Sequence, residues 1–116
     1  MHFIKTFKNN YVINQVKKQK LPEFNESEVK RYKVHFKGRV QKVGFRLEVC
    51  EMSRRLNLIG YAKNLEKGDV IAELQGQEDK INYLLSFMNS LKRIKIDYMR
   101  KEELPLIEGE NTVERL

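Results

Sequence analysis

A candidate anion-binding loop spans Gly38-Arg39-Val40-Gln41-Lys42-Val43-Gly44-Phe45-Arg46. A glycine-containing turn that leads into a helix presents several backbone N–H groups to one point, and the helix dipole adds partial positive charge there. The guanidinium of Arg46 supplies a planar fork that suits two phosphate oxygens. These residue types predict an anion cradle, although glycine loops before helices are common and many arginines only cap surfaces.

Other chemistries find little support among the reactive residue types. His2 and His35 are the only histidines, and neither lies in a cluster with metal-ligand spacing. Cys50 is the only cysteine, which excludes an intramolecular disulfide and a Cys-cluster metal site. We expect Cys50 to be a small packing residue and His35 to lie on a strand face. The sequence therefore predicts no metal, no cofactor and no Ser-His-Asp or Cys-His nucleophile.

Length and composition indicate one compact domain of 116 residues, 41% hydrophobic and 34% charged. No apolar run approaches the ~18 residues that a membrane span needs, and no secretory signal is visible. Together with the lack of disulfides, this predicts a cytoplasmic protein. The net charge is +7, but residues 1–20 carry five lysines and no acid, so the rest holds 18 basic and 16 acidic groups.

The first 30 residues differ from the rest, and we interpret them as a basic N-terminal extension, partly helical, followed by a linker. Leu21-Pro22 marks a break, and Glu23 to Lys30 is polar. A basic amphipathic helix is predicted before the break from an apolar stripe of Phe3, Phe7 and Tyr11, with Ile4, Val12 and Val16 close to it. We favour docking on the following domain over an anionic membrane or a partner groove, because the apolar residues are few.

Residues 31–116 are predicted to form the main domain. Its expected elements are a strand at Tyr32, Val34 and Phe36, a helix at Phe45, Val49, Met52 and Leu56, a strand from Leu58 to Asn64, a strand at Val70, Ala72 and Leu74 that ends at Gly76, a helix at Ile81, Leu84, Leu85, Met88 and Leu91, a strand from Ile94 to Glu102, and a short edge strand near Thr112 to Leu116. This order predicts an α+β fold, the ferredoxin-like βαββαβ sandwich. Its four- or five-stranded antiparallel sheet carries two helices on one face.

Two motifs carry a family resemblance. Residues Gly38 to Arg46 closely resemble the acylphosphatase signature Gly-x-Val-Gln-Gly-Val-x-Phe-Arg. The second signature of that family is similar to Gly60-Tyr61-Ala62-Lys63-Asn64, followed by Gly68, Val70 and Gly76. The resemblance covers residues 31 to 103 and agrees with the predicted strand order.

The resemblance implies a small, metal-independent hydrolase of acyl phosphates. By family analogy, Arg46 and the backbone N–H groups of Gln41, Lys42 and Val43 bind the phosphoryl group, and Asn64 positions the attacking water. The leaving group is a carboxylate, a weak base, so no general acid is needed. Fixed N–H groups and a guanidinium can stabilise the transition-state charge.

Two departures from the family pattern leave an alternative open. Lys42 stands where the family has glycine, and a lysine with positive φ there costs on the order of 1 kcal/mol and distorts the amide array. With negative φ, Lys42 only adds positive charge. Thr112 to Leu116 resemble the closing strand of the family only loosely. A non-catalytic anion-binding or regulatory module is therefore the alternative function.

We expect a small-molecule acyl phosphate as the partner, with no stable membrane insertion and a monomeric state. RNA-recognition domains share this sandwich and stack bases on aromatic residues of the central strands. The predicted strand from Asp69 to Gln75 has no aromatic residue, so nucleic acid is not expected. Both motifs lie beyond residue 37, which predicts that residues 1–22 are dispensable for hydrolysis and that their helix covers the open sheet face near Ile71.

Overall fold

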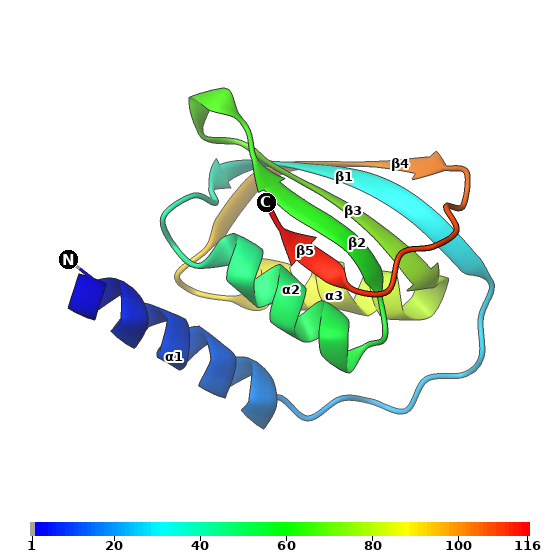
Figure 1. The fold of residues 1–116 in the computed structure, drawn as a ribbon, viewed down its shortest axis with the longest axis horizontal. Helices are drawn as coiled ribbons and strands as arrows, with labels where there is room; N and C mark the ends of the chain where they lie inside the picture. Colours follow the sequence, from blue (N-terminus) through cyan, green and yellow to red (C-terminus); the bar gives the residue numbers. More distant parts are fainter. Residues whose placement is uncertain (1) are drawn as a thin grey trace.

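The computed structural model describes residues 2–116, with side chains from residue 9 onward. Its elements are α1 (His2–Lys18), β1 (Val29–Arg39), α2 (Phe45–Arg55), β2 (Ile59–Asn64), the 3-10 turn η1 (Glu66–Gly68), β3 (Val70–Gln77), α3 (Glu78–Ser90), β4 (Lys95–Leu104) and β5 (Val113–Arg115). The strands form one sheet in the order β4-β1-β3-β2-β5, and α2 and α3 cover one of its faces (Figure 1). The predicted ferredoxin-like α+β sandwich is confirmed.

The sheet is mixed rather than antiparallel, because β5 pairs parallel to β2. The other three pairings, β1 with β3, β1 with β4 and β2 with β3, are antiparallel. Residues 105–112 carry the chain from the end of β4, at one edge of the sheet, to the opposite edge. The chain therefore enters β5 at the same end of the sheet at which it left β4, which fixes the direction of β5.

The core forms between the sheet and the two helices that cover it, from the alternating and helical positions that the sequence predicts. Its fully buried side chains include Val34, Phe36, Phe45, Met52, Leu56, Ala72, Leu74, Ile81, Leu84 and Met88. β1 begins at Val29, before the predicted domain boundary, and β3 continues one residue past Gly76. The ladder explains both extensions, because Val29 pairs with Gln77 and Lys30 with Gly76.

The segment before β1 packs on the domain and caps α3, so it is not a free linker. The N-cap residue of α3, Gln77, makes no side-chain cap. Instead, the backbone N–H of Glu78 donates to the carbonyl oxygen of Glu28 (3.0 Å), and that of Asp79 donates to Oγ of Ser27 (3.2 Å). These bonds satisfy N–H groups that a helix start leaves without an intrahelical partner.

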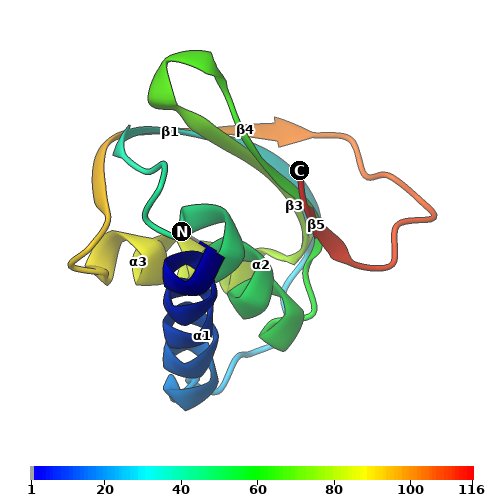
Figure 2. The same cartoon turned by 60° about the vertical axis from the view of Figure 1, so that its left-hand side comes forward.

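The helix α1 packs beside α2, in a third layer away from the sheet (Figures 1 and 2). The prediction that it docks on the domain is confirmed, but the prediction that it covers the open sheet face is wrong. Val12 and Val16 are buried, whereas Tyr11 is 58% exposed. The side chains of the predicted stripe residues Phe3, Ile4 and Phe7 lie outside the described residues.

The open face of the sheet, the face without helices, carries charged residues of β1, among them Arg31 and Lys33. On the helix side, the Arg55 guanidinium donates to the carbonyl oxygens of Val16 and Gln19, both at 2.6 Å, at the C-terminus of α1. A cation at this end of a helix is also favoured by the helix dipole.

Within residues 2–116, no helix is long and apolar enough to cross a membrane.

Arg31 holds the loop 105–112 against the open face. Its side chain is only 1% exposed and forms ion pairs with Glu73 (3.0 Å) and Glu110 (2.6 Å). Nearby, the Gln75 amide accepts a hydrogen bond from the backbone N–H of Ile107 and donates one to its carbonyl oxygen. Arg31 thus joins β1 and β3 to the loop that delivers β5.

Replacing Arg31 by methionine is expected to lower the free energy of unfolding by about 2–3 kcal/mol, because two partly buried carboxylates lose their cation. Urea unfolding at pH 7 measures the loss. The matched control is Lys33→Met, on the same strand and face, which should cost less than about 0.5 kcal/mol. Equal losses in the two variants would contradict a special role for Arg31.

Acid should remove part of this stabilisation. Burial raises the pKa of Glu73, but the hydrogen bonds from Tyr61 and Arg31 outweigh it, so the pKa lies below its ordinary value of 4.5. A carboxylate with a lowered pKa stabilises the fold above its unfolded-state pKa, and this contribution is lost as the pH falls through the folded-state pKa. The wild type should therefore lose more stability than Arg31→Met between pH 7 and acid pH.

Candidate functional site

The loop 40–44 connects β1 to α2 and has two residues with left-handed backbone. Val40 is 1% exposed and anchors the loop in the core. Lys42 has φ 63° and Gly44 has φ 77°. Gly44 is the N-cap of α2, and none of the described side chains caps that helix end. The loop therefore leads into a helix N-terminus where anions are favoured by the N–H groups and the dipole.

The sequence leaves open whether Lys42 has a positive or a negative φ, and in the structure its φ is positive. Its φ of 63° lies in the region that glycine adopts easily and other residues adopt at a cost. The side chain is exposed, so its positive charge lies at the surface beside the loop. The loop thus keeps its left-handed turn at the expense of strain at Lys42.

Replacing Lys42 by glycine is expected to raise the free energy of unfolding by up to about 1 kcal/mol, because the strain disappears. Chemical denaturation measures the change. Lys67→Gly is a matched control, since Lys67 is exposed and has φ 69° in η1. Both variants should gain stability, and only Lys42→Gly should change phosphate affinity. A loss of stability at Lys42 would show that its side chain compensates for the strain.

Gln41 ties the loop to the turn after β2 through its side chain. Its Nε2 donates to the carbonyl oxygens of Leu65 and Asp69, both at 2.8 Å. The sequence predicted a role only for the backbone N–H of Gln41, and the structure adds this side-chain contact. It holds the loop next to the end of β2, where Asn64 lies.

Asn64 ends β2 with a buried oxygen that lacks a donor. It lies two residues after Ala62, which faces the core, so both side chains are on the helix side of the sheet. Its Oδ1 is buried, and none of the described residues donates a hydrogen bond to it. Leaving such an acceptor unsatisfied costs free energy, so each case needs an explanation, such as a water or a ligand.

Arg46 reaches the same strand end from the first turn of α2. Its Nη1 donates to the main-chain carbonyl oxygen of Leu116 at 2.5 Å. The N–H of Leu116 in turn donates to the carbonyl oxygen of Ala62 at 2.8 Å. A guanidinium has five N–H donors, so one bond leaves others for an anion. Gln41, Arg46 and Asn64 thus all lie at the end of β2.

The ion pair between Arg93 and Glu48 lies next to the loop 40–44, which Arg93 contacts. Nε of Arg93 donates to the carbonyl oxygen of Val43 at 2.7 Å, and Nη1 donates to Oε1 of Gln15 in α1 at 2.8 Å. Nη2 pairs with the fully buried carboxylate of Glu48. Burial raises the pKa of Glu48, and the bond to Arg93 opposes this rise. The sequence offered one sign of this pair, because Glu48 falls on the apolar stripe of its helix.

The comparison with known proteins identifies the family. Residues 32–112 match the acylphosphatase family. The chain belongs to this family. The acylphosphatase of Aliivibrio fischeri is 37% identical over 75 residues, which cover 64% of this chain and 83% of that protein. The acylphosphatase of Clostridium beijerinckii is 38% identical over 84 residues, or 69% of this chain and 90% of that protein.

Solved structures of acylphosphatases agree with this assignment. The enzyme from Coxiella burnetii superimposes with a TM-score of 0.69 at 27% identity and covers 76% of this chain and 93% of its own. The acylphosphatase from Bacillus subtilis gives a TM-score of 0.69 at 26% identity, with 77% and 99% covered. By homology, the chain is an enzyme of the acylphosphatase family. The match begins after α1, so α1 lies outside the segment matched to the family.

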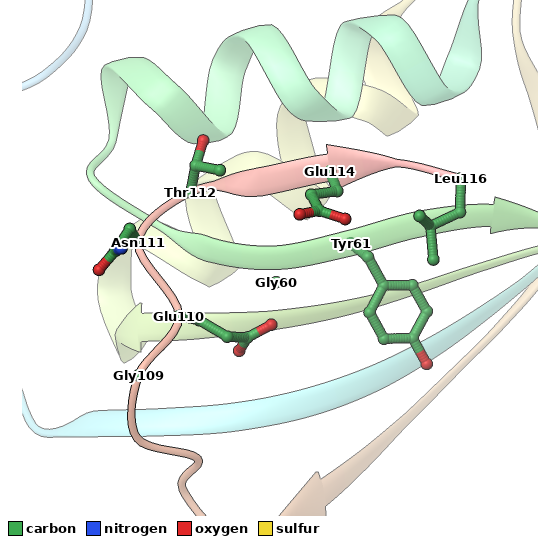
Figure 3. Close-up of a pocket in the computed structure, with 8 residues that line it drawn as sticks. All are labelled: Gly60, Tyr61, Gly109, Glu110, Asn111, Thr112, Glu114 and Leu116. Carbon is green, nitrogen blue, oxygen red and sulfur yellow. The ribbon is translucent and has the colours of Figure 1, made fainter.

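One cavity of this acylphosphatase-family chain is lined by residues other than those of the loop 40–44. It has a volume of about 340 Å³. Figure 3 shows its lining from β2, β5 and the loop before β5, with Gly60, Tyr61, Gly109, Glu110, Asn111, Thr112, Glu114 and Leu116. Its carboxylates, Glu110 and Glu114, make it unsuitable for a phosphate. None of the five predicted site residues lines it.

Cys50 and His35 have the structural roles expected of them. Cys50 is 1% exposed in α2, and burial raises the pKa of its thiol to about 11. A thiol with so high a pKa is a poor nucleophile at neutral pH. His35 lies on β1, where its Nε2 is 2.8 Å from Oδ2 of Asp69.

Proposed function

We propose that the chain hydrolyses the carboxyl–phosphate bond of acyl phosphates to a carboxylate and inorganic phosphate. In this proposal, Arg46 and the backbone N–H groups of Gln41, Lys42 and Val43 hold the phosphoryl group. Asn64 orients the attacking water. Membership of the acylphosphatase family supports the reaction class, and the contacts at the end of β2 support these roles.

The donor-free oxygen of Asn64 is the observation that carries the proposal. A water that attacks phosphorus needs an acceptor for one of its protons and must lie in line with the leaving group. Oδ1 of Asn64 is such an acceptor. The uncapped start of α2 and the Arg46 guanidinium supply donors for the phosphoryl oxygens. An acceptor beside a group of donors suits water attack on a phosphoryl group.

The reaction needs no further ionisable side chain. Water forms the new P–O bond, the bond from phosphorus to the acyl oxygen breaks, and its electron pair leaves with the carboxylate. The proton of the water passes to a phosphoryl oxygen. Because the carboxylate is a weak base, it leaves without protonation. Charge on the equatorial oxygens is stabilised by donors that are already in position, which lowers the reorganisation required.

The deciding experiment measures phosphate release from acetyl phosphate in the presence of EDTA. We expect turnover, with competitive inhibition by inorganic phosphate. The strained Lys42 supports one alternative, a module that binds phosphate without turnover. Phosphate binding without hydrolysis would favour that module, and hydrolysis gained in Lys42→Gly would then assign the defect to this residue.

A further inference from the structure

The N-terminal helix contacts the loop 40–44 directly, on the side where Arg93 also lies. A Cβ atom placed on Gly44 would lie 2.9 Å from Cγ2 of Val12, so the valine methyl occupies the space beside this glycine. The same Cβ would lie 3.7 Å from Nη2 of Arg93. Val12 is 0% exposed, so this contact lies in the buried interface between α1 and the domain.

Arg93 binds both α1 and the loop, and its bond to the loop fixes the orientation of one peptide group. Its guanidinium binds Gln15 of α1 and the carbonyl oxygen of Val43 at the same time. In a planar trans peptide the N–H points opposite to the carbonyl group. A fixed carbonyl at Val43 therefore directs the N–H of Gly44 away from Arg93, to the other side of the loop.

We propose that α1 is part of the active-site framework: Val12 and Gln15, through Gly44 and Arg93, hold the phosphate-binding loop in its binding conformation. These are positioning residues, because they act on the loop and not on the substrate. The inference rests on the proposed function in one respect, that the loop binds the phosphoryl group. It reverses the sequence-based prediction that residues 1–22 are dispensable for hydrolysis.

Two matched pairs of residues, three residues in α1 and Gln19 directly after it, separate positioning from simple stabilisation. Val16 is buried like Val12 and lies one turn later, but it belongs to the main core. Gln19 binds the domain through its side chain like Gln15, but its partner is the hydroxyl group of Tyr83 in α3 (3.2 Å). Within each pair, substitution by alanine removes the same atoms. Only Val12 in the first pair contacts Gly44 of the loop, and only Gln15 in the second binds Arg93.

The experiment compares Val12→Ala with Val16→Ala, and Gln15→Ala with Gln19→Ala, in the full chain. Calorimetric titration gives the Kd of inorganic phosphate, acetyl phosphate kinetics give KM and kcat, and thermal unfolding gives Tm. Within each pair we expect similar losses in Tm. Val12→Ala and Gln15→Ala should weaken phosphate binding and raise KM by about 5- to 10-fold, with kcat changed less. Val16→Ala and Gln19→Ala should leave the phosphate Kd within about twofold of the wild type.

Equal phosphate Kd values within both pairs would overturn the proposal and limit α1 to a stabilising role. A wild type that binds phosphate without hydrolysing acetyl phosphate would refute the proposed function, while the Kd comparison would still decide the role of α1. A wild type that binds no phosphate would overturn both. Arg93→Lys is a further test, because it removes the guanidinium without truncating the side chain to alanine. A lysine cannot bind Gln15, Val43 and Glu48 at the same time as the guanidinium does, so we expect this variant to bind phosphate more weakly.

Discussion

Substituting Arg46 by alanine should lower kcat/KM for acetyl phosphate about 10³-fold and weaken inhibition by inorganic phosphate in parallel. The guanidinium is proposed to hold the phosphoryl group before and during the reaction, so both binding and turnover depend on it. Initial rates over a range of substrate and phosphate concentrations measure the two effects. The fold should persist, because the side chain is partly exposed and its bond to Leu116 lies at the end of the sheet.

Arg54→Ala is the matched control for this experiment. Arg54 lies on the same helix, is exposed, and pairs with Glu51 at 2.7 Å. Its loss should change neither kinetics nor phosphate inhibition. Arg46→Lys keeps the charge but loses the planar fork, and we expect it to restore only part of the phosphate affinity. Near-normal activity of Arg46→Ala at low substrate concentration would remove Arg46 from the site.

Replacing Asn64 by alanine should lower kcat about 10²-fold while KM and phosphate inhibition change little. The proposed bond to water is useful mainly in the transition state, so its loss appears in turnover rather than in binding. Stability provides the second readout. Because Oδ1 accepts no hydrogen bond from the described residues, its removal should not lower Tm.

A competing interpretation is that Asn64 only supports the turn toward Gly68, as asparagine often does. In that case Tm would fall and kcat would stay close to that of the wild type. Lys63→Ala serves as the control, since Lys63 is the preceding residue of β2 and is exposed. Its kinetics should match those of the wild type. Parallel losses in kcat and phosphate affinity at Asn64 would instead assign it to phosphate binding.

The sequence was sufficient for the parts of the fold that depend on local periodicity. Alternation at Tyr32, Val34 and Phe36 placed β1, and the spacing of Val49 and Met52 placed α2. These patterns work because each element buries one face, so its apolar residues follow the period of that element. The two motifs likewise predicted the family, because their glycines and polar residues occur at fixed spacings.

Contacts between distant segments could not be predicted from the sequence. Nothing local shows that Val12 of α1 is buried while Tyr11 is exposed, since this depends on which surface of the domain is apolar. The direction of β5 depends on the path of the loop before it. Arg93 resembles any other surface arginine until the fold brings it to the Val43 carbonyl group and Glu48.

The capping of α3 by Ser27 and Glu28 bears on where this chain can be shortened. A fragment limited to residues 32–112, the span matched to the family, would lose both capping residues and Arg31. At the other end it would lose β5, with the buried Val113 and the carbonyl group of Leu116 that Arg46 binds. The segment that relatives share by sequence is thus shorter than the segment whose contacts complete the fold and the site.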